Sequence, residues 1–223
     1  MTDFALARRN MVESQVRTND VTDHALIAAM LDVPRERFVP PAMRELAYID
    51  EDVPLKDVDS AGGRRWLMEP MPFARLVQLA EITATDLVLD VGCATGYSTA
   101  VMARLAESVV GLESDADLAA KAEASLIDEG IGNAAIVTGD MAKGYASQGP
   151  YDAIVLEGAV EHVPEDLFAQ LREGGRLVAA VIDGPIGKAT LFRSTGGGIS
   201  SRVAFDVNVQ PLPGFAKAPE FVF

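Results

Sequence analysis

A short apolar run followed at once by small residues constrains the fold more than any other feature of the chain. Residues 87–91, Leu-Val-Leu-Asp-Val, form a largely apolar run typical of a strand buried on both faces of a parallel sheet. Gly92, Ala94 and Gly96 follow, and residues 97–105 continue as a predicted helix. Such a turn presents backbone N–H groups at a helix N-terminus, where a ligand can approach the main chain. The sequence therefore predicts a strand, a ligand-binding loop and a helix.

The spacing of these small residues narrows the ligand that the loop can take. A dinucleotide-binding loop has the pattern Gly-x-Gly-x-x-Gly, but Ala94 and Tyr97 stand where its second and third glycines would be. No Lys-Ser or Lys-Thr pair follows the loop to hold a triphosphate and Mg²⁺. Asp90, just before the loop, would repel a pyrophosphate and attract a positively charged amino group. The pattern therefore excludes a P-loop and argues against a dinucleotide.

The pattern Asp90-x-Gly92-x-Ala94-x-Gly96 resembles motif I of the class I S-adenosyl-L-methionine (SAM) methyltransferases, with Ala94 in place of the usual middle glycine. The resemblance implies that SAM is the cofactor and S-adenosyl-L-homocysteine the product. The loop residues expected to contact the cofactor are Asp90, Gly92, Cys93, Ala94 and Gly96.

Residues at the ends of later predicted strands complete the expected cofactor site. Glu113 ends the strand after the loop helix, where its carboxylate can accept hydrogen bonds from both ribose hydroxyls; its alternative role is to cap the next helix. Asp140 ends the following strand and would take the adenine amino group, with helix capping as a close alternative. Met141 and Glu157, which lie at or just after the ends of the third and fourth strands, are assigned to the same site.

The remaining candidates for chemistry are one cysteine and two histidines. Cys93 has no histidine nearby in the sequence and occupies a loop position where small residues let the backbone approach a ligand. Packing is therefore a better interpretation than nucleophilic catalysis. His24 and His162 do not belong to a metal-ligand spacing, and no metal is expected. His162 follows the fourth strand, where it could line the substrate mouth or lie on the surface.

Composition limits the expected location and partners. The chain has 223 residues, of which 49% are hydrophobic and 23% charged, and no uninterrupted apolar run approaches membrane-spanning length. Its net charge of −14, with scattered basic residues, disfavours a nucleic-acid partner. The N-terminus lacks the pattern of a signal peptide and a single cysteine excludes an intrachain disulfide. We therefore expect a soluble, cytoplasmic protein without a membrane partner.

Apolar patterning predicts a helical arm followed by alternating strands and helices. Residues 1–80 form the expected arm and acceptor-side segment, residues 81–223 the core, and the two make one compact unit. The arm has predicted helices at 4–17, 25–32 and 75–81; the core has strands at 87–91, 109–113, 135–138, 151–156 and 176–181, helices at 97–105, 116–129 and 164–171, and a hairpin of 190–194 and 203–209. Repeated βα units predict a doubly wound, parallel α/β sheet. The resemblance implies its Rossmann-like seven-stranded form, with the hairpin as an antiparallel edge.

Four further strings resemble the N-terminal arm of the protein-L-isoaspartate O-methyltransferases. In chain order they are Met11-Val12-Glu13, Val33-Pro34-Arg35-Glu36-Arg37-Phe38-Val39-Pro40, Leu46-Ala47-Tyr48 and Pro54-Leu55. Together with motif I, they extend the resemblance over nearly the whole chain. This resemblance implies methyl transfer from SAM to the carboxylate of an isoaspartyl residue in a protein or peptide.

The acceptor-side segment departs from the family pattern, which is roughly G-Q-T-I-S-x-P. Aligned on Pro70, the segment here is Arg64-Arg65-Trp66-Leu67-Met68-Glu69-Pro70, so Met68 stands at the serine and cannot donate a hydrogen bond. Glu157 and Glu161 would add negative charge that repels an acidic acceptor. We therefore expect low isoaspartyl activity. The acceptor-side candidates are Arg64, Arg65, Trp66, Met68, Glu157 and His162.

Met68 leaves two alternatives open. In the first, the chain is a SAM-dependent methyltransferase for another protein group or a small molecule. In the second, it is a SAM-binding or protein-interacting module without transferase activity.

Overall fold

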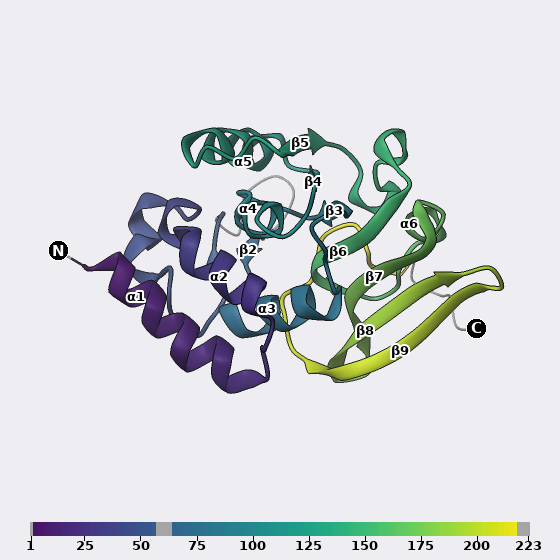
Figure 1. Cartoon of the computed structure of the whole chain (residues 1–223), viewed down its shortest axis with the longest axis horizontal. Helices are drawn as coiled ribbons and strands as arrows, with labels where there is room; N and C mark the ends of the chain where they lie inside the picture. The colour runs from purple at the N-terminus through teal and green to yellow at the C-terminus, as the bar shows by residue number, and fades with distance from the viewer. Residues whose placement is uncertain (1, 57–63, 218–223) are drawn as a thin grey trace, which may run out of the picture.

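The described residues, 2–56 and 64–217 of the computed structural model, form a seven-stranded mixed sheet with helices on both faces (Figure 1). The strand order is β5-β4-β3-β6-β7-β8-β9, in which the first five strands are parallel, and β8 and β9 each pair antiparallel with the strand before them. The strands are β3 (Leu87–Val91), β4 (Ser108–Glu113), β5 (Ala134–Thr138), β6 (Tyr151–Val160), β7 (Leu171–Asp183), β8 (Ile186–Thr195) and β9 (Gly198–Val207). The predicted fold class is confirmed. The strand order reverses between β3 and β6, and ligands of such sheets bind beyond the carboxyl ends of the strands at this point.

The helices of the arm precede β3. Of these, α1 and α2 lie on the side of the molecule opposite the β8–β9 hairpin, whereas α3 lies beside β7 (Figure 1). The helices are α1 (Phe4–Met11), α2 (His24–Asp32), α3 (Pro70–Leu79), α4 (Tyr97–Ala103), α5 (Ala116–Asp128) and α6 (Glu165–Phe168). Between α2 and α3 the chain forms two 3₁₀ turns, Arg35–Arg37 and Pro41–Leu46, and a small antiparallel sheet of β1 (Val53–Pro54) and β2 (Trp66–Leu67). In the part of the chain that the structure describes, no helix is long and apolar enough to cross a membrane.

Several element bounds differ from those predicted. The first helix leaves the α conformation after Met11 and continues as a π-helical turn, Val12–Val16. Helix α3 begins at Pro70 rather than at Arg75, because a proline at the first helical position has no N–H to lose. Helix α6 covers only four residues, and β6 and β7 are longer than expected. Between the predicted helices at 25–32 and 75–81, where no regular element was predicted, the structure has the two 3₁₀ turns and β1.

Alternate side chains of the central strands enter two separate apolar clusters. On β3, Val88 faces the cluster that α2 to α5 and the arm build, whereas Leu89 faces the cluster on the other side of the sheet. On β6, Val155 and Leu156 alternate in the same way. The first cluster runs from Met11 in the arm to residues of β9, so the arm and the sheet share one core.

The Val33–Pro40 string anchors the arm to the loop after β3. The buried Arg35 guanidinium donates to the carbonyls of Ala47 and Met68, both at 2.7 Å, and lies 4.9 Å from the ring centroid of Tyr97. The Phe38 ring packs edge-on against the same Tyr97 ring, 5.7 Å between centroids. The Phe38 carbonyl accepts a hydrogen bond of 2.5 Å from Thr95 of the loop. The string therefore positions both the loop and the acceptor-side segment.

The Phe38 contact gives a testable expectation for stability. Phe38→Ala removes a fully buried ring between the arm and α4, and we expect the free energy of unfolding to fall by about 3–5 kcal/mol. Urea unfolding would measure this loss. Leu6→Ala, at an exposed position of α1, is the control and should change the value by about 0.5 kcal/mol or less. Equal effects of the two substitutions would contradict the anchoring role.

Candidate functional site

The loop after β3 has the geometry of a tight backbone approach. Gly92, Ala94 and Gly96 have φ values of 85°, 51° and 91°. A Cβ atom on Gly92 would lie 2.6 Å from Cδ1 of Leu212, and one on Gly96 would lie 3.1 Å from Cβ of Ala122 in α5. The left-handed conformation costs a residue with a Cβ about 1–2 kcal/mol, so Ala94 strains the loop where the motif usually has glycine.

Asp90 lies beneath this loop and keeps one free acceptor. Its side chain is fully buried, and Oδ2 accepts hydrogen bonds from Ser98 Oγ at 2.7 Å and Thr99 Oγ1 at 2.5 Å. Oδ1 has no hydrogen-bond partner among the described residues. Burial raises the pKa of Asp90 to about 7, although the two hydroxyl groups oppose this rise. A buried carboxylate oxygen without a partner is suited to receive a positively charged amino group.

Glu113, at the end of β4, is fully buried and surrounded by donors. Its Oε2 accepts from the backbone N–H of Ala94 at 2.9 Å, and its Oε1 accepts from those of Ser114 at 2.8 Å and Asp115 at 3.0 Å. The capping alternative for Glu113 is not realised, because Asp115 caps α5 by accepting from Asp117 and Leu118. Glu113 instead connects the end of β4 to the loop.

Arg65 pairs with both oxygens of this carboxylate. Its Nη1 donates to Oε1 of Glu113 at 2.9 Å, and its Nη2 lies 2.8 Å from Oε2. Nη2 also donates to the Gly92 carbonyl at 2.9 Å, and Nη1 lies 3.8 Å from the sulfur of Met141. The prediction grouped Arg65 with the acceptor side, but the structure places its guanidinium among residues of the expected cofactor site. Lys56 pairs with Asp115, so a second ion pair holds the β1–β2 segment over the same turn.

One narrow cavity brings together three of the predicted acceptor-side residues, Trp66, Met68 and Glu157. They line it with Asp52, Gly158, Val209 and Gln210. Glu157 lies where the pairing of β6 with β7 shifts register, between Val155 and Ala159, and such bulges re-aim side chains beside functional sites. Burial raises the pKa of Glu157 well above its ordinary value, and the nearby Asp90 adds to the rise.

A wider cavity of about 500 Å³ adjoins this narrow one and shares with it Asp52, Trp66, Val209 and Gln210. Its acidic lining residues are Glu51, Asp52, Glu69 and Asp206, and its other lining residues are Trp66, Met71, Pro72, Phe205, Val207, Asn208, Val209 and Gln210. Partial burial raises the pKa of Glu69, and the nearby carboxylates, Asp52 first among them, contribute. The acceptor-side cavities are therefore negatively charged.

Five predicted residues lie apart from this arrangement or have another role. Arg64 and His162 are exposed. Asp140 is exposed and accepts from the backbone N–H of Ala142 at 3.0 Å, which is the capping alternative. Cys93 is buried, and burial raises the pKa of its thiol well above its ordinary value, which supports the packing interpretation. Glu161 does not lie beside Glu157: it is exposed and accepts a hydrogen bond from the backbone N–H of Lys217 at 2.7 Å. The prediction that Glu161 adds a second negative charge on the acceptor side is therefore wrong.

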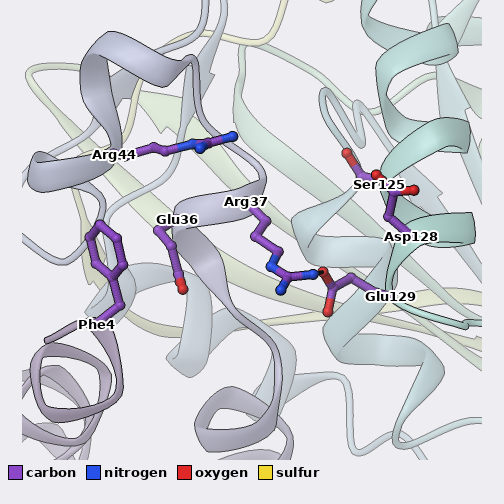
Figure 2. A pocket seen from close by; sticks show the side chains of 7 residues that line it. All are labelled: Phe4, Glu36, Arg37, Arg44, Ser125, Asp128 and Glu129. Atoms are coloured by element: carbon purple, nitrogen blue, oxygen red, sulfur yellow. Dashed lines mark hydrogen bonds and ion pairs between the residues drawn. The ribbon is translucent and has the colours of Figure 1, made fainter.

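A further hollow of about 440 Å³ lies between the arm and α5 (Figure 2). Its lining residues are Phe4, Glu36, Arg37, Arg44, Ser125, Asp128 and Glu129, none of which belongs to the predicted site. Arg37 reaches across it to pair with Glu129 at 2.8 Å. This ion pair ties the arm to α5.

Comparisons with known proteins show the family of this chain. The family model described as protein-L-isoaspartate(D-aspartate) O-methyltransferase matches residues 7–211, which include the arm, the loop and both cavities. The chain belongs to this family. A protein-L-isoaspartate O-methyltransferase of Koribacter versatilis is 35% identical over 214 residues, 96% of this chain and 94% of its relative. One of Rhodopseudomonas palustris is 38% identical over 81% of this chain and 71% of its relative.

Solved structures share the fold. A protein-L-isoaspartate O-methyltransferase superposes with a TM-score of 0.80 at 25% identity, covering 93% of this chain and 67% of the other. A structure from Plasmodium falciparum, described as this enzyme in complex with S-adenosyl-L-homocysteine, has a TM-score of 0.74 at 22% identity and covers 93% and 98% of the two chains.

The raised pKa of Asp90 predicts a pH-dependent stability. The folded protein binds the proton of the Asp90 carboxyl group more tightly than the unfolded chain does, because the pKa of an unfolded aspartate is about 4. The wild type therefore loses stability as pH rises from about 4 to about 7, and Asp90→Asn escapes the loss. We expect the free energy of unfolding of Asp90→Asn, minus that of the wild type, to be about 1–3 kcal/mol larger at pH 8 than at pH 5 in urea unfolding. A difference that is the same at both pH values would contradict the assignment.

Proposed function

We propose that this chain transfers the methyl group of SAM to the carboxylate of isoaspartyl residues in proteins, the reaction for which its family is named. The observation that carries the proposal is the family match over residues 7–211, which spans the loop, the arm string and the acceptor-side segment together. Relatives of nearly equal length carry the same description.

The loop and its surroundings fit SAM. The unpartnered Oδ1 of Asp90 suits the ammonium group of the methionine part, and the loop glycines allow close approach of the main chain. The Glu113 carboxylate suits the ribose hydroxyls, and Met141 with Asp140 would flank the adenine. Bound SAM supplies an activated methyl group.

The chain itself has little acid–base work to do in this reaction. An acceptor carboxylate is already ionised near neutral pH, so the protein aligns it with the methyl group and excludes water. Met68 faces the narrow cavity without a donor, while its carbonyl is held by Arg35. The Asp52 carboxylate opposes a carboxylate acceptor, and no arginine or lysine lines this cavity among the described residues, so binding of this acceptor needs a cation from elsewhere in the site.

The negative charge of the cavities favours a second candidate acceptor. A neutral or cationic group, on a protein or a small molecule, would meet no repulsion from Asp52 or Glu157. The raised pKa of Glu157 also makes its carboxylate a stronger base than an ordinary glutamate, which suits proton removal from such an acceptor. A module that binds SAM without transferring methyl groups is the third possibility.

One experiment separates these proposals. Methyl-labelled SAM is incubated with a peptide that contains isoaspartate, with the same peptide that contains aspartate, and with a cell extract. Of the two peptides, we expect only the isoaspartyl peptide to become labelled. Label that appears only on extract components supports another acceptor, and no label despite measured SAM binding supports the inactive module.

Position 68 should limit the rate with the isoaspartyl peptide. Met68→Ser would supply a hydroxyl donor to the acceptor carboxylate, and such a bond, worth about 1.5–3 kcal/mol, would raise kcat/KM about tenfold or more. Steady-state assays of the labelled peptide would measure the change. Met43→Ser, a partly buried position of the arm outside both cavities, is the control and should not raise the rate. A slower Met68→Ser enzyme would show that a hydroxyl here does not reach the acceptor.

A further inference from the structure

Arg65 lies where the proposed ribose site meets the acceptor cavity. Its guanidinium contacts Glu113 and the Gly92 carbonyl, while the next residue, Trp66, lines the cavity that contains Glu157. The positive charge of Arg65 also opposes the burial-driven rise in the pKa values of Asp90 and Glu157. One guanidinium is therefore within electrostatic reach of both sites.

Glu113 cannot hold Arg65 and a ribose at the same time. Five nitrogen atoms lie within 3.0 Å of its two oxygens, three from the backbone and two from Arg65. A carboxylate offers about four lone-pair sites, so it has no capacity left for two ribose hydroxyls. The backbone donors are fixed by the loop and by the turn into α5. Arg65 is the donor that can leave.

The acceptor side has the opposite need, because a carboxylate acceptor must be neutralised there. Among the described residues that line the two acceptor-side cavities, none is an arginine or a lysine. Arg35 lies close by, and its Nη1 has no hydrogen-bond partner among the described residues. Its guanidinium is fully buried, however, lines neither cavity, and is held by the carbonyls of Ala47 and Met68. Arg65 is joined directly to cavity-lining Trp66, and it loses its partner if the ribose takes Glu113.

We propose that Arg65 exchanges partners: the ribose of SAM displaces it from Glu113, and the freed guanidinium binds the acceptor carboxylate. The inference rests on the proposed function, because it takes SAM and a carboxylate as the ligands. It makes Arg65 a substrate-binding residue that supplies the positive charge missing from the cavity. It also fixes the order of binding, since the acceptor gains its cation only after SAM has bound.

Arg65→Gln tests the exchange because it places the family's residue at this position and should move two quantities in opposite directions. Without the competing guanidinium, the Kd for SAM in calorimetry should fall about tenfold or more. Without the cation, the KM for an isoaspartyl peptide should rise about tenfold or more. Arg202→Gln removes the same charge from an exposed position of β9 and should change neither constant.

The opposite signs distinguish the exchange from a structural role, which would weaken both ligands together. SAM affinity that is unchanged or lower in Arg65→Gln overturns the proposal, as does an unchanged peptide KM. If the wild type binds SAM but does not methylate the peptide, the proposed function fails, and the SAM affinity of the variant still decides whether the ribose displaces Arg65.

The wild type offers a second measurement that does not require the variant to fold. Trp66 is the chain's only tryptophan, it is half-buried, and it is bonded to Arg65 along the chain. Displacement of Arg65 by SAM should therefore shift its fluorescence emission, and the shift should be smaller in a folded Arg65→Gln variant. Emission that stays unchanged at saturating SAM in the wild type overturns the exchange.

Discussion

The buried carboxylate of Glu113 is the point on which the site depends. It ends β4, accepts a hydrogen bond from the N–H of Ala94 in the loop after β3, and pairs with Arg65 of the acceptor-side segment. Removing one member of a buried pair leaves an uncompensated charge, which is far more costly than the net worth of the pair itself. The loop, the turn into α5 and the β1–β2 segment therefore meet at a single side chain.

The left-handed Ala94 shows how closely the loop depends on this carboxylate. An alanine at φ 51° is strained, and in this conformation its N–H donates to Glu113 at 2.9 Å. The hydrogen bond to a buried charge offsets the backbone cost. The loop can therefore do without a middle glycine as long as Glu113 keeps its place.

Local signals in the sequence were enough to predict the centre of the fold. The strand from Leu87, the loop and the following helix lie within one short stretch, and the later βα units repeat the same periodicity. The pairing of Arg65 with Glu113 could not be predicted, since it joins residues 48 positions apart and depends on how β1–β2 sits over the sheet. The bulge at Glu157 was missed for a similar reason. It depends on the pairing of β6 with β7 and on the bridge from Ala159 to Pro211.

The way Arg35 holds the acceptor-side segment bears on how this family can diversify. The guanidinium donates hydrogen bonds to the main-chain oxygens of Ala47 and Met68, so these bonds do not depend on either side chain. A mutation at position 68 can thus alter the chemistry offered to the acceptor while the backbone stays in register. The contacts that hold the backbone are thus separate from the side chain that meets the acceptor, so an enzyme of this design can evolve a new substrate preference without a change of fold.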